Sequence, residues 1–390
     1  MHSLKVFQTE FLKFEIFNSN NLMGCDKPVD EEAIKKFWND LFAMKFNLEV
    51  AKTEIDKYAN NRNYQTVWSS TDLYGYLKWA LKKYDAQFVT NAWIKYYEIW
   101  NIIKPHKDII NIFCNAELPG ASISAFNHYC DTHDLKYYWW ASSYMPDGVG
   151  TMLGDTYGIF KANRNNWLMN EKNNGDCTVL KNLLDFEKRI GPESEIGGMD
   201  LYSHDAGLDI SPEEYNKQEE KNTHLHLGCA LAGFLTLRRN GNFVAKQYTY
   251  FTKLNIELIV LYSTMFEKFY ITKPLTSRPY NSEIYLVGLK FIGMPDTVRK
   301  LLEDRVSHFH FGDLLNDAFI CESTYQQILK SLDIFKNQIL YINQNVGLLA
   351  KNINNKYYKK NNFKAQAEKL IAAWIKNNPI SPLKHPLIGS

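Results

Sequence analysis

The sequence predicts an α/β fold, with an open, mostly parallel sheet that has an antiparallel last strand and is flanked by N- and C-terminal helical additions. Between about residues 87 and 293, short apolar runs of strand length alternate with segments whose apolar residues recur at helical spacing. The last two apolar runs, 268–272 and 284–291, lie too close together for a helical crossover, which predicts an antiparallel pair. We therefore expect a helical region at 1–86, a central domain at 87–293 and a helical region at 294–390.

The composition is that of a globular protein without a dominant charge. The 390 residues, 45% of them hydrophobic, suffice for one large domain with additions or for two domains. Lys and Arg number 45 against 43 Asp and Glu, which excludes a uniformly basic nucleic-acid-binding surface but permits a local basic groove. The six cysteines form no C-x-x-C pair, the start lacks a signal-peptide core, and no apolar window reaches membrane-spanning length. We expect a soluble cytoplasmic protein that has no membrane partner.

Helices are expected first along the chain. Val29–Glu32 and Ser70–Asp72 have the composition of helix starts. Thr90 is expected to cap a further helix, whose apolar face includes Trp93 and Tyr97 and which leads into a strand at Ile109.

The segment from Ile109 to Tyr129 predicts a strand, a tight turn and a helix that together form a ligand loop. Gly120 can let the backbone approach a ligand, Pro119 stiffens the turn, and the helix start would direct free N–H groups into the cleft above the strand. Glu117 makes this mouth acidic. Because the loop is neither Gly-rich nor Lys-bearing, a cationic or amino-bearing ligand such as S-adenosylmethionine fits better than a nucleotide phosphate. An ordinary strand-to-helix connection with a surface Glu is the alternative.

The rest of the central domain continues the alternation. Strands are expected at 137–141, 199–204, 242–245, 268–272 and 284–291, and helices at 179–190, 213–237 and 254–266. The long loop at 144–177, rich in Asn and Gly, is of a kind that is often functional.

Charged side chains are expected to gather at one edge of this sheet. In open α/β sheets, ligands bind outside the carboxyl ends of the strands. Glu117, Asp205 and Lys246 follow or end strands there, and Glu283 opens the antiparallel strand on the same side. Lys95 lies on the helix before the first strand. Each charge alone could be a solvated strand end, but their joint placement predicts a site.

Five motifs resemble those of the FtsJ-type RNA ribose 2′-O-methyltransferases, in particular their cap-methylating branch and the members from African swine fever virus and related large DNA viruses. In chain order these are Thr90–Ile99 (similar to A-W-x-K-x-x-E-I), Glu117–Gly120 with Asn127–Tyr129 (cofactor loop), Ser203–Gly207 (acidic motif), Gly241–Lys246 (second lysine motif) and Lys273–Tyr285 (last motif). Residues 174–176 and 215–220 also resemble segments of the viral members. The resemblance covers roughly residues 87–291 and implies a Rossmann-like methyltransferase sheet.

The resemblance also implies a catalytic tetrad and a cofactor, S-adenosyl-L-methionine. The tetrad would be Lys95, Asp205, Lys246 and Glu283. The cofactor would contact Glu117, Leu118, Pro119, Gly120, Asp205 and, near the adenine, Asp176. Two positions depart from the family pattern: Ala121 stands where many relatives have a second glycine, and Ser142–Ser143 stand where an acidic ribose partner is often found.

A ribose 2′-hydroxyl is a poor nucleophile at neutral pH, so it needs a base aligned with the sulfonium methyl group. Lys246 can act as this base only when it is neutral. Desolvation and Lys95 would lower the pKa of Lys246, whereas Asp205 and Glu283 would raise it. No metal is required. Of the two His-x-His pairs, at 224–226 and 308–310, the first lies on a predicted helix, where residues two apart point away from each other.

Predicted RNA contacts are fewer. Lys273 and Arg278 are the candidates for phosphate binding, with a structural salt bridge as the alternative for both. The basic stretch Lys351–Lys364, with Tyr357 and Tyr358 near its centre, could also bind RNA, or it could be a solvated helix end.

The leading hypothesis is an S-adenosylmethionine-dependent mRNA cap ribose 2′-O-methyltransferase. Its partner would be RNA with a capped mRNA 5′ end, and other capping or transcription proteins could associate with it. If the protein is viral, its location would be the host cytoplasm or the virion. The alternatives are 2′-O-methylation of ribosomal or transfer RNA, and a non-catalytic methyltransferase-fold subunit of an mRNA capping complex. An intact tetrad argues against the last of these.

Overall fold

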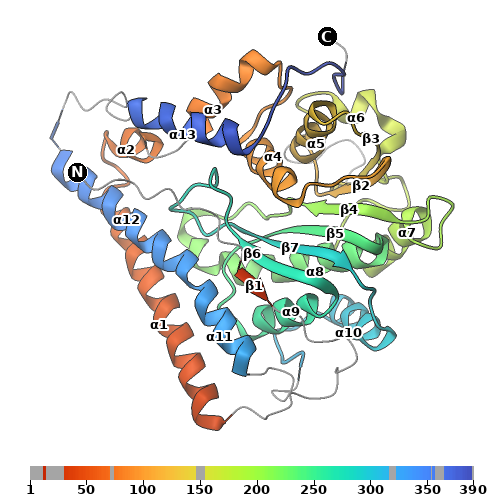
Figure 1. Ribbon diagram of the computed structural model, residues 1–390. Coiled ribbons are helices and arrows are strands. Elements are labelled where there is room, and N and C mark those ends of the chain that lie inside the picture. Colours follow the sequence, from red (N-terminus) through yellow and green to blue (C-terminus); the bar gives the residue numbers. More distant parts are fainter. Residues whose placement is uncertain are drawn as a thin grey trace.

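The computed structural model describes residues 12–14, 30–70, 74–145, 154–315, 322–352, 354–355 and 364–388. They form a seven-stranded sheet with helices on both faces (Figure 1). Most of the basic stretch Lys351–Lys364 and most of the helix start expected at Ser70–Asp72 lie outside the described residues. In the described part, no helix is long and apolar enough to cross a membrane.

The sheet has the strand order β1-β6-β7-β5-β4-β2-β3. Its strands are β1 (Leu12–Phe14), β2 (Ile109–Asn115), β3 (Lys136–Ala141), β4 (Met199–His204), β5 (Leu237–Gln247), β6 (Phe266–Thr272) and β7 (Ile284–Phe291). Strands β2 to β5 are parallel, β7 is antiparallel to both β5 and β6, and β1 is antiparallel to β6. The predicted mostly parallel sheet with an antiparallel last strand is therefore confirmed. Strand β1 was not predicted, because three residues are too few to reveal a period of two.

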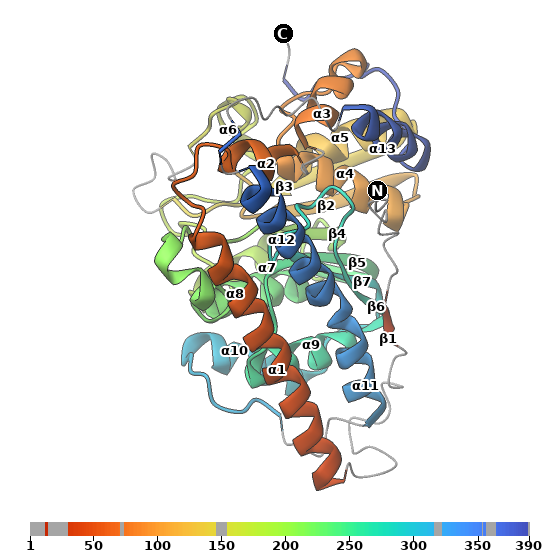
Figure 2. The ribbon, with the colours of Figure 1, turned by 90° about the vertical axis from the view of Figure 1, so that its left-hand side faces the viewer.

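Helices form a layer on each face of the sheet (Figures 1 and 2). One layer contains α3 (Tyr74–Leu81), α4 (Asn91–Ile103), α5 (Ala121–Thr132) and α13 (Lys364–Asn377). The other contains α7 (Leu180–Ile190), α8 (Gln218–Thr236), α9 (Lys253–Ser263) and α10 (Asp296–Ser307). The long helices α1 (Glu31–Asp56) and α12 (Asp333–Asn352) lie side by side along one end of the layers. The shorter helices are α2 (Tyr64–Ser70), α6 (Ile159–Ala162) and α11 (Glu322–Ser331).

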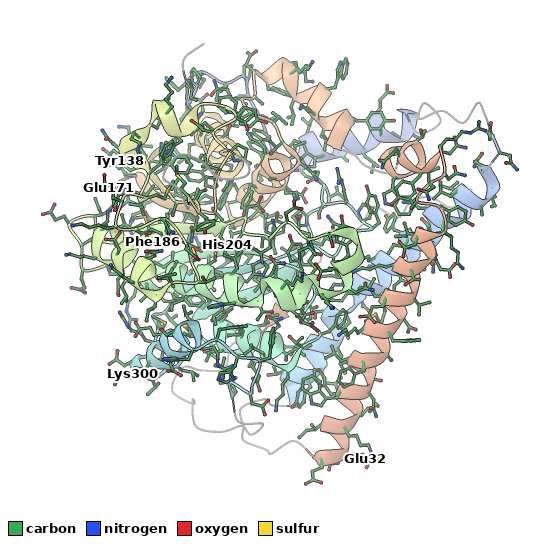
Figure 3. All side chains as sticks on the ribbon, turned by 180° about the vertical axis from the view of Figure 1, so that it is seen from behind. Glu32, Tyr138, Glu171, Phe186, His204 and Lys300 are labelled. Carbon is green, nitrogen blue, oxygen red and sulfur yellow. The ribbon has the colours of Figure 1, made fainter. Side chains whose placement is uncertain are left out.

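The core is divided by the sheet into two main hydrophobic clusters, and the flanking helices contribute to both. Phe37 and Leu41 of α1 belong to the cluster that includes α8 and α9. Trp374 of α13 belongs to the cluster that includes α4 and α5. Figure 3 shows His204, the last residue of β4, well inside the molecule, whereas Tyr138 lies at its periphery.

Three predicted elements have other boundaries in the structure. The helix expected at 213–237 is a 3₁₀ turn at Pro212–Lys217 followed by α8. Because α8 passes directly into β5, that strand begins at Leu237 rather than at residue 242. The helix expected at 254–266 ends at Ser263, because Phe266 belongs to β6 and packs against Phe291 with ring centroids 5.3 Å apart.

Candidate active site

Three strands bring three of the four predicted catalytic residues to one edge of the sheet. Asp205 follows β4, Lys246 lies near the end of β5, and Glu283 precedes β7. These strands are neighbours, and β7 runs opposite to the other two, so its start lies beside their carboxyl ends. Lys95 approaches from α4, whose start is fixed by a hydrogen bond from the Trp93 N–H to Thr90 Oγ1 (3.1 Å).

The four side chains form two ion pairs. Lys95 Nζ lies 2.5 Å from Glu283 Oε1, and their side chains are 5% and 11% exposed. Lys246 Nζ donates to the Asp205 carbonyl oxygen (2.9 Å) and lies 3.3 Å from Asp205 Oδ1. The Lys246 and Asp205 side chains are 11% and 23% exposed. The second pair is therefore the one that a substrate can reach more easily.

The charges of the two pairs change each other's protonation. Burial alone would raise the pKa of Glu283, but the ammonium groups of Lys95 and Lys246 bring it down to about 2. Burial alone would lower the pKa of Lys246, but the Asp205 carboxylate holds it above its ordinary value. Of the opposing effects considered from the sequence, the carboxylates therefore outweigh desolvation. Lys246 is an ammonium group at neutral pH in this structure.

Tyr96, which the sequence analysis missed, links α4 to the strand that carries Asp205. Its hydroxyl donates to the His204 carbonyl oxygen (2.8 Å), and its side chain is fully buried. A tyrosine within an apolar helix gives no sequence signal that separates this contact from ordinary packing.

Glu98, also on α4, fixes the loop that leads to Glu283. Its carboxylate accepts hydrogen bonds from the Leu275 N–H (2.5 Å) and from the Thr276 N–H and hydroxyl (3.2 and 3.0 Å). Burial raises the pKa of Glu98, while these hydrogen bonds oppose the shift. The same carboxylate accepts from Trp374 Nε1 of α13 (3.3 Å), so a C-terminal helix contacts this network.

Lys273 lies inside the same loop. Its Nζ donates to the carbonyl oxygens of Glu283 (2.8 Å) and Asn281 (3.0 Å) and to Asn281 Oδ1 (2.7 Å). Burial lowers the pKa of Lys273 to about 7, with Glu283 opposing the shift. These contacts give Lys273 a structural position in the loop, whereas Arg278 is exposed. Phosphate binding by either residue stays a prediction.

Glu117 is turned inward at the start of α5. The residue is 3% exposed, and its Oε1 accepts the Ile123 N–H at 2.9 Å. Burial raises its pKa to about 8, with the Ile123 hydrogen bond opposing and the Asp205 charge adding to the shift. The helix start that was expected to direct free N–H groups into the cleft is thus partly occupied by a side chain of the loop itself.

The next residues of this loop contact the segment that follows β3 and the helix α6. The Leu118–Pro119 peptide bond is cis, and the Leu118 N–H donates to Ser143 Oγ (2.8 Å). Gly120 has φ +110°, and a Cβ at this position would overlap Ile159 Cδ1 of α6. Glycine is thus favoured by the backbone conformation, and an added Cβ would also force the terminal methyl group of Ile159 to shift.

Asp176 is half-buried at the end of the long loop. Its Oδ1 accepts from the Thr178 N–H (2.9 Å) and hydroxyl (2.7 Å), and its own N–H donates to Asn174 Oδ1 (3.1 Å). This turn lies near the end of β3, because the Met145 N–H donates to the Asn174 carbonyl oxygen (2.8 Å).

The acidic groups around these segments suit a ligand with positive charges and hydroxyl groups. Glu117 lies close enough to the Asp205 carboxylate for that charge to raise its pKa further, so Glu117 is mostly protonated at neutral pH and would become ionised beside a bound cation, and Asp176 adds a carboxyl group at the neighbouring turn. S-adenosylmethionine, whose sulfonium and amino groups are cationic, fits this set of residues.

The histidines of the two His-x-His pairs have other partners. His224 Nε2 lies 2.9 Å from the Val306 carbonyl oxygen, His226 Nδ1 lies 2.6 Å from Gln247 Oε1, and His308 Nδ1 lies 3.0 Å from Asp304 Oδ1. Among the residues that the structure describes, no group of three or more His, Cys, Asp or Glu could hold a metal ion.

Comparison with known proteins identifies the family. A family model described as FtsJ-like methyltransferase matches residues 137–291, from β3 to the end of β7. The probable methyltransferase EP424R of African swine fever virus (isolate Pig/Kenya/KEN-50/1950) is 35% identical over 320 residues, which are 77% of this chain and 73% of that protein. The chain belongs to the FtsJ-like methyltransferase family. The family resemblance seen in the sequence is thereby confirmed.

Two further relatives of this FtsJ-like methyltransferase extend the comparison. An uncharacterised protein of Acanthamoeba polyphaga mimivirus is 29% identical over 325 residues, covering 76% of this chain and 40% of that protein. Cap-specific mRNA (nucleoside-2′-O-)-methyltransferase 2 of Drosophila melanogaster is 26% identical over 296 residues, covering 71% of this chain and 41% of that protein.

Proposed function

We propose that this FtsJ-like methyltransferase transfers a methyl group from S-adenosyl-L-methionine to a ribose 2′-hydroxyl at the capped 5′ end of mRNA. The observation that carries the proposal is the meeting of Lys95, Asp205, Lys246 and Glu283 as two ion pairs at the carboxyl edge of the sheet. The similarity to a cap-specific methyltransferase supports the choice of a capped substrate. The viral relative supports a location in the host cytoplasm or the virion.

In this proposal each member of the tetrad has a separate task. S-adenosyl-L-methionine, when bound, supplies an electrophilic methyl group on a sulfonium that leaves as a thioether. The 2′-oxygen forms its bond to the methyl carbon as the carbon–sulfur bond breaks, and Lys246 takes the 2′-proton. Because Lys246 is an ammonium group in the structure without ligands, it must first release its own proton to solvent, which the nearby sulfonium charge of the bound cofactor would favour. Asp205 orients Lys246 Nζ through its carbonyl and carboxylate oxygens. Lys95 keeps Glu283 anionic and in place.

The cofactor contacts are assigned to the residues expected from the sequence: Glu117, Leu118, Pro119, Gly120, Asp176 and Asp205. The backbone of Glu117 and Leu118 is held by Ser142 and Ser143, since the Glu117 N–H donates to the Ser142 carbonyl oxygen (3.0 Å) and the Leu118 N–H to Ser143 Oγ. The two serines that depart from the family pattern therefore position the loop. Glu117 acts mainly through the start of α5.

The deciding experiment measures methyl transfer from labelled cofactor to three short RNAs that differ only at the 5′ end. These are capped, uncapped, and capped with the first ribose already 2′-O-methylated. We expect transfer to the first RNA alone. Equal transfer to uncapped RNA would instead favour ribosomal or transfer RNA as the substrate. If no RNA is methylated although the cofactor binds, the protein is a non-catalytic subunit.

A further inference from the structure

Four polar side chains form a stripe on the buried side of α8. Glu219, Asn222, Thr223 and His226 recur at helical spacing, and each is at most 6% exposed. A helix side that packs against the core ordinarily has apolar residues, because a buried polar group costs free energy unless it has partners. The partners of these four residues, which we call the α8 polar stripe, therefore indicate which parts of the molecule the stripe fixes.

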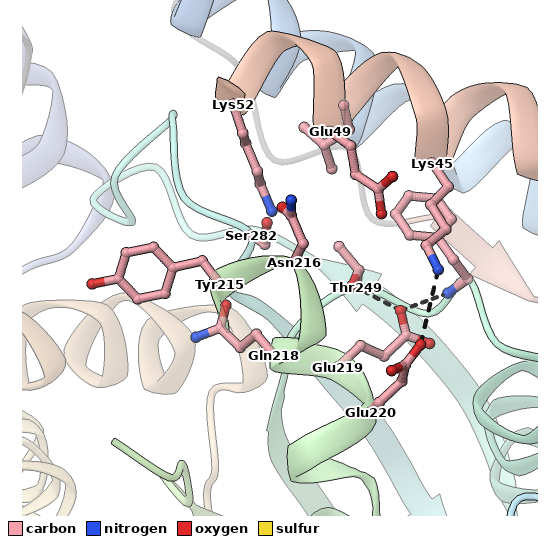
Figure 4. Close-up of a pocket in the computed structure, with 12 residues that line it drawn as sticks. Lys45, Glu49, Lys52, Tyr215, Asn216, Gln218, Glu219, Glu220, Thr249 and Ser282 are labelled. Atoms are coloured by element: carbon pink, nitrogen blue, oxygen red, sulfur yellow. Dashed lines mark hydrogen bonds and ion pairs between the residues drawn. The ribbon is translucent and has the colours of Figure 1, made fainter. Parts of the chain in front are cut away.

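Glu219 and Thr223 fix the segment that follows β5. The Glu219 carboxylate accepts five hydrogen bonds of 2.7 to 2.9 Å from residues 249–255, one of them from the Thr249 hydroxyl (Figure 4). Thr223 Oγ1 accepts from Asn255 Nδ2 in the same segment (3.1 Å). These contacts begin three residues after Lys246, so they fix the chain that leaves the active-site edge.

Asn222 and His226 fix the segment that follows β4 and contains Asp205. Asn222 Oδ1 accepts the Leu208 N–H (2.8 Å), and His226 Nε2 lies 3.1 Å from the Ala206 carbonyl oxygen. The hydrogen bonds that the backbone N–H groups of Asp205 and Ala206 donate to other residues are longer, 3.4 Å each. The α8 polar stripe thus makes closer contacts to this segment than those two backbone groups do.

His226 also contacts the strand that carries Lys246, through Nδ1, which lies 2.6 Å from Gln247 Oε1. Burial and the Lys246 charge lower the pKa of His226 to about 4, against the Ala206 contact, so the ring is neutral and has a single N–H. The Ala206 carbonyl oxygen can only accept a hydrogen bond, whereas the Gln247 amide can turn and offer its NH2 group to Nδ1. The proton of the ring therefore belongs on Nε2, which donates to Ala206.

We propose that His226 is a positioning residue for the Asp205–Lys246 pair and acts through the hydrogen bond from its Nε2–H to the Ala206 carbonyl oxygen. The inference rests on the proposed function, in which this pair activates the 2′-hydroxyl. Lys246 Nζ donates to the Asp205 carbonyl oxygen (2.9 Å), which belongs to the peptide unit leading to Ala206. A displacement of Ala206 therefore displaces the group that holds the Lys246 ammonium, and a misplacement of about 1 Å can lower a rate by roughly 100-fold.

The test uses two variants of the full chain that each keep one of the two contacts. The amide nitrogen of Gln can take the place of Nε2 and the amide of Asn that of Nδ1, so His226→Gln keeps the Ala206 contact and His226→Asn keeps the Gln247 contact. Both variants lose one buried hydrogen bond, so both should lower the melting temperature by roughly 2–4 °C. His226→Asn should lower kcat for methyl transfer at least about tenfold, with unchanged KM for capped RNA and for the cofactor.

The matched variants should keep most of the activity. We expect kcat of His226→Gln to stay within about threefold of the wild-type value, because the Ala206 contact is kept. Gln247→Met removes the Nδ1 contact from the other side and should behave in the same way. Equal losses of kcat in the two His226 variants would overturn the positioning role.

A second measurement does not depend on catalysis. Modification of Lys246 by an amine-reactive reagent at about pH 9 is followed by mass spectrometry, with the exposed Lys268 as reference. Because the Asp205 contacts favour the ammonium form, their loosening in His226→Asn should raise the relative rate roughly tenfold, which corresponds to one unit of pKa. His226→Gln should leave the rate unchanged.

The two measurements separate this inference from the proposed function. Equal modification rates in both His226 variants would overturn the positioning role, while methylation of capped RNA by the wild type would still support the enzyme assignment. If the rates differ as expected but the wild type methylates no RNA, His226 positions the pair and the proposed function is wrong.

Discussion

Among the individual residues, Lys246 has the protonation state that matters most to the proposed reaction, and burial and Asp205 shift its pKa in opposite directions. We expect Lys246→Ala to lower methyl transfer at least about 100-fold, the smallest usual contribution of a well-placed base. Cofactor affinity should stay within a few-fold, since the proposed role of Lys246 is at the 2′-hydroxyl and not at the cofactor. Lys268→Ala, which removes an exposed lysine from β6, is the matched control. Activity above about a tenth of the wild-type level would remove Lys246 from the base role.

The lowered pKa of Lys273 predicts how the free energy of unfolding should depend on pH. Its pKa is about 7 in the folded protein and near 10.5 in the unfolded chain. Between these two values the unfolded chain binds the extra proton, so the contribution of Lys273 to the free energy of unfolding rises with pH. Below pH 7 both states are protonated and the contribution is constant.

The measurement for Lys273 is a difference in thermal unfolding between wild type and Lys273→Met at several pH values. The wild-type melting temperature should rise relative to the variant from pH 7 to pH 9.5. Because the two melting temperatures are subtracted, the contributions of groups that titrate in both proteins, including Glu117, cancel. A flat or falling difference would contradict the lowered pKa of Lys273.

At the scale of elements, cofactor binding should depend on an undisturbed contact between the Glu117–Gly120 loop and α6. Gly120→Ala combines a left-handed backbone conformation, which costs roughly 1–2 kcal/mol for a residue with a Cβ, with an overlap on Ile159. We expect it to weaken both stability and cofactor affinity, measured by thermal unfolding and calorimetry. Gly158→Ala has the same kind of backbone strain but no atom within 4 Å of the new Cβ, so it should weaken them less. The double variant Gly120→Ala with Ile159→Ala should recover part of the loss, and failure to do so would mean that the overlap is relieved elsewhere.

The elements that could be predicted from the sequence are those with a clear periodic pattern. The strand at Ile109 and the helix capped by Thr90 follow from apolar spacing and a capping residue, and the edge that gathers Asp205, Lys246 and Glu283 follows from strand order. The inward turn of Lys273 and the five hydrogen bonds to Glu219 could not be predicted, because their partners are distant in the chain or belong to irregular loops. From the sequence alone, a charged residue in a loop is expected to be solvated, because only the folded structure shows which distant groups surround it.

At the scale of the whole molecule, the C-terminal segment at 379–388 packs against the layer of helices that contains α4 and α5. It contacts α4 through the Pro379 carbonyl oxygen and Tyr97 (2.6 Å), and α5 through the His385 carbonyl oxygen and Asn127 (3.0 Å). Gln87, just before α4, donates to the Ile388 carbonyl oxygen (2.9 Å). Each of these hydrogen bonds contributes about 1 kcal/mol.

Removal of residues 379–390 should therefore destabilise the layer of helices that contains α4 and α5. We expect the melting temperature to fall by roughly 6–12 °C, since three hydrogen bonds of about 1 kcal/mol each are lost and a loss of 1 kcal/mol lowers it by about 2–4 °C in a domain of 150–250 residues. Removal of residues 389–390 alone serves as the control. Unchanged melting of the shorter chain would mean that these contacts are not maintained in solution.

Helix α4 makes four different contacts within little more than one turn. Lys95, Tyr96, Tyr97 and Glu98 reach, respectively, Glu283, the end of β4, the C-terminal segment and the loop at 275–276. Because one turn contains 3.6 residues, these side chains leave the helix in all directions. In a library of single substitutions selected for activity, α4 should have no tolerant face. By contrast, α12 buries a single stripe and should tolerate change with a helical period along its other sides.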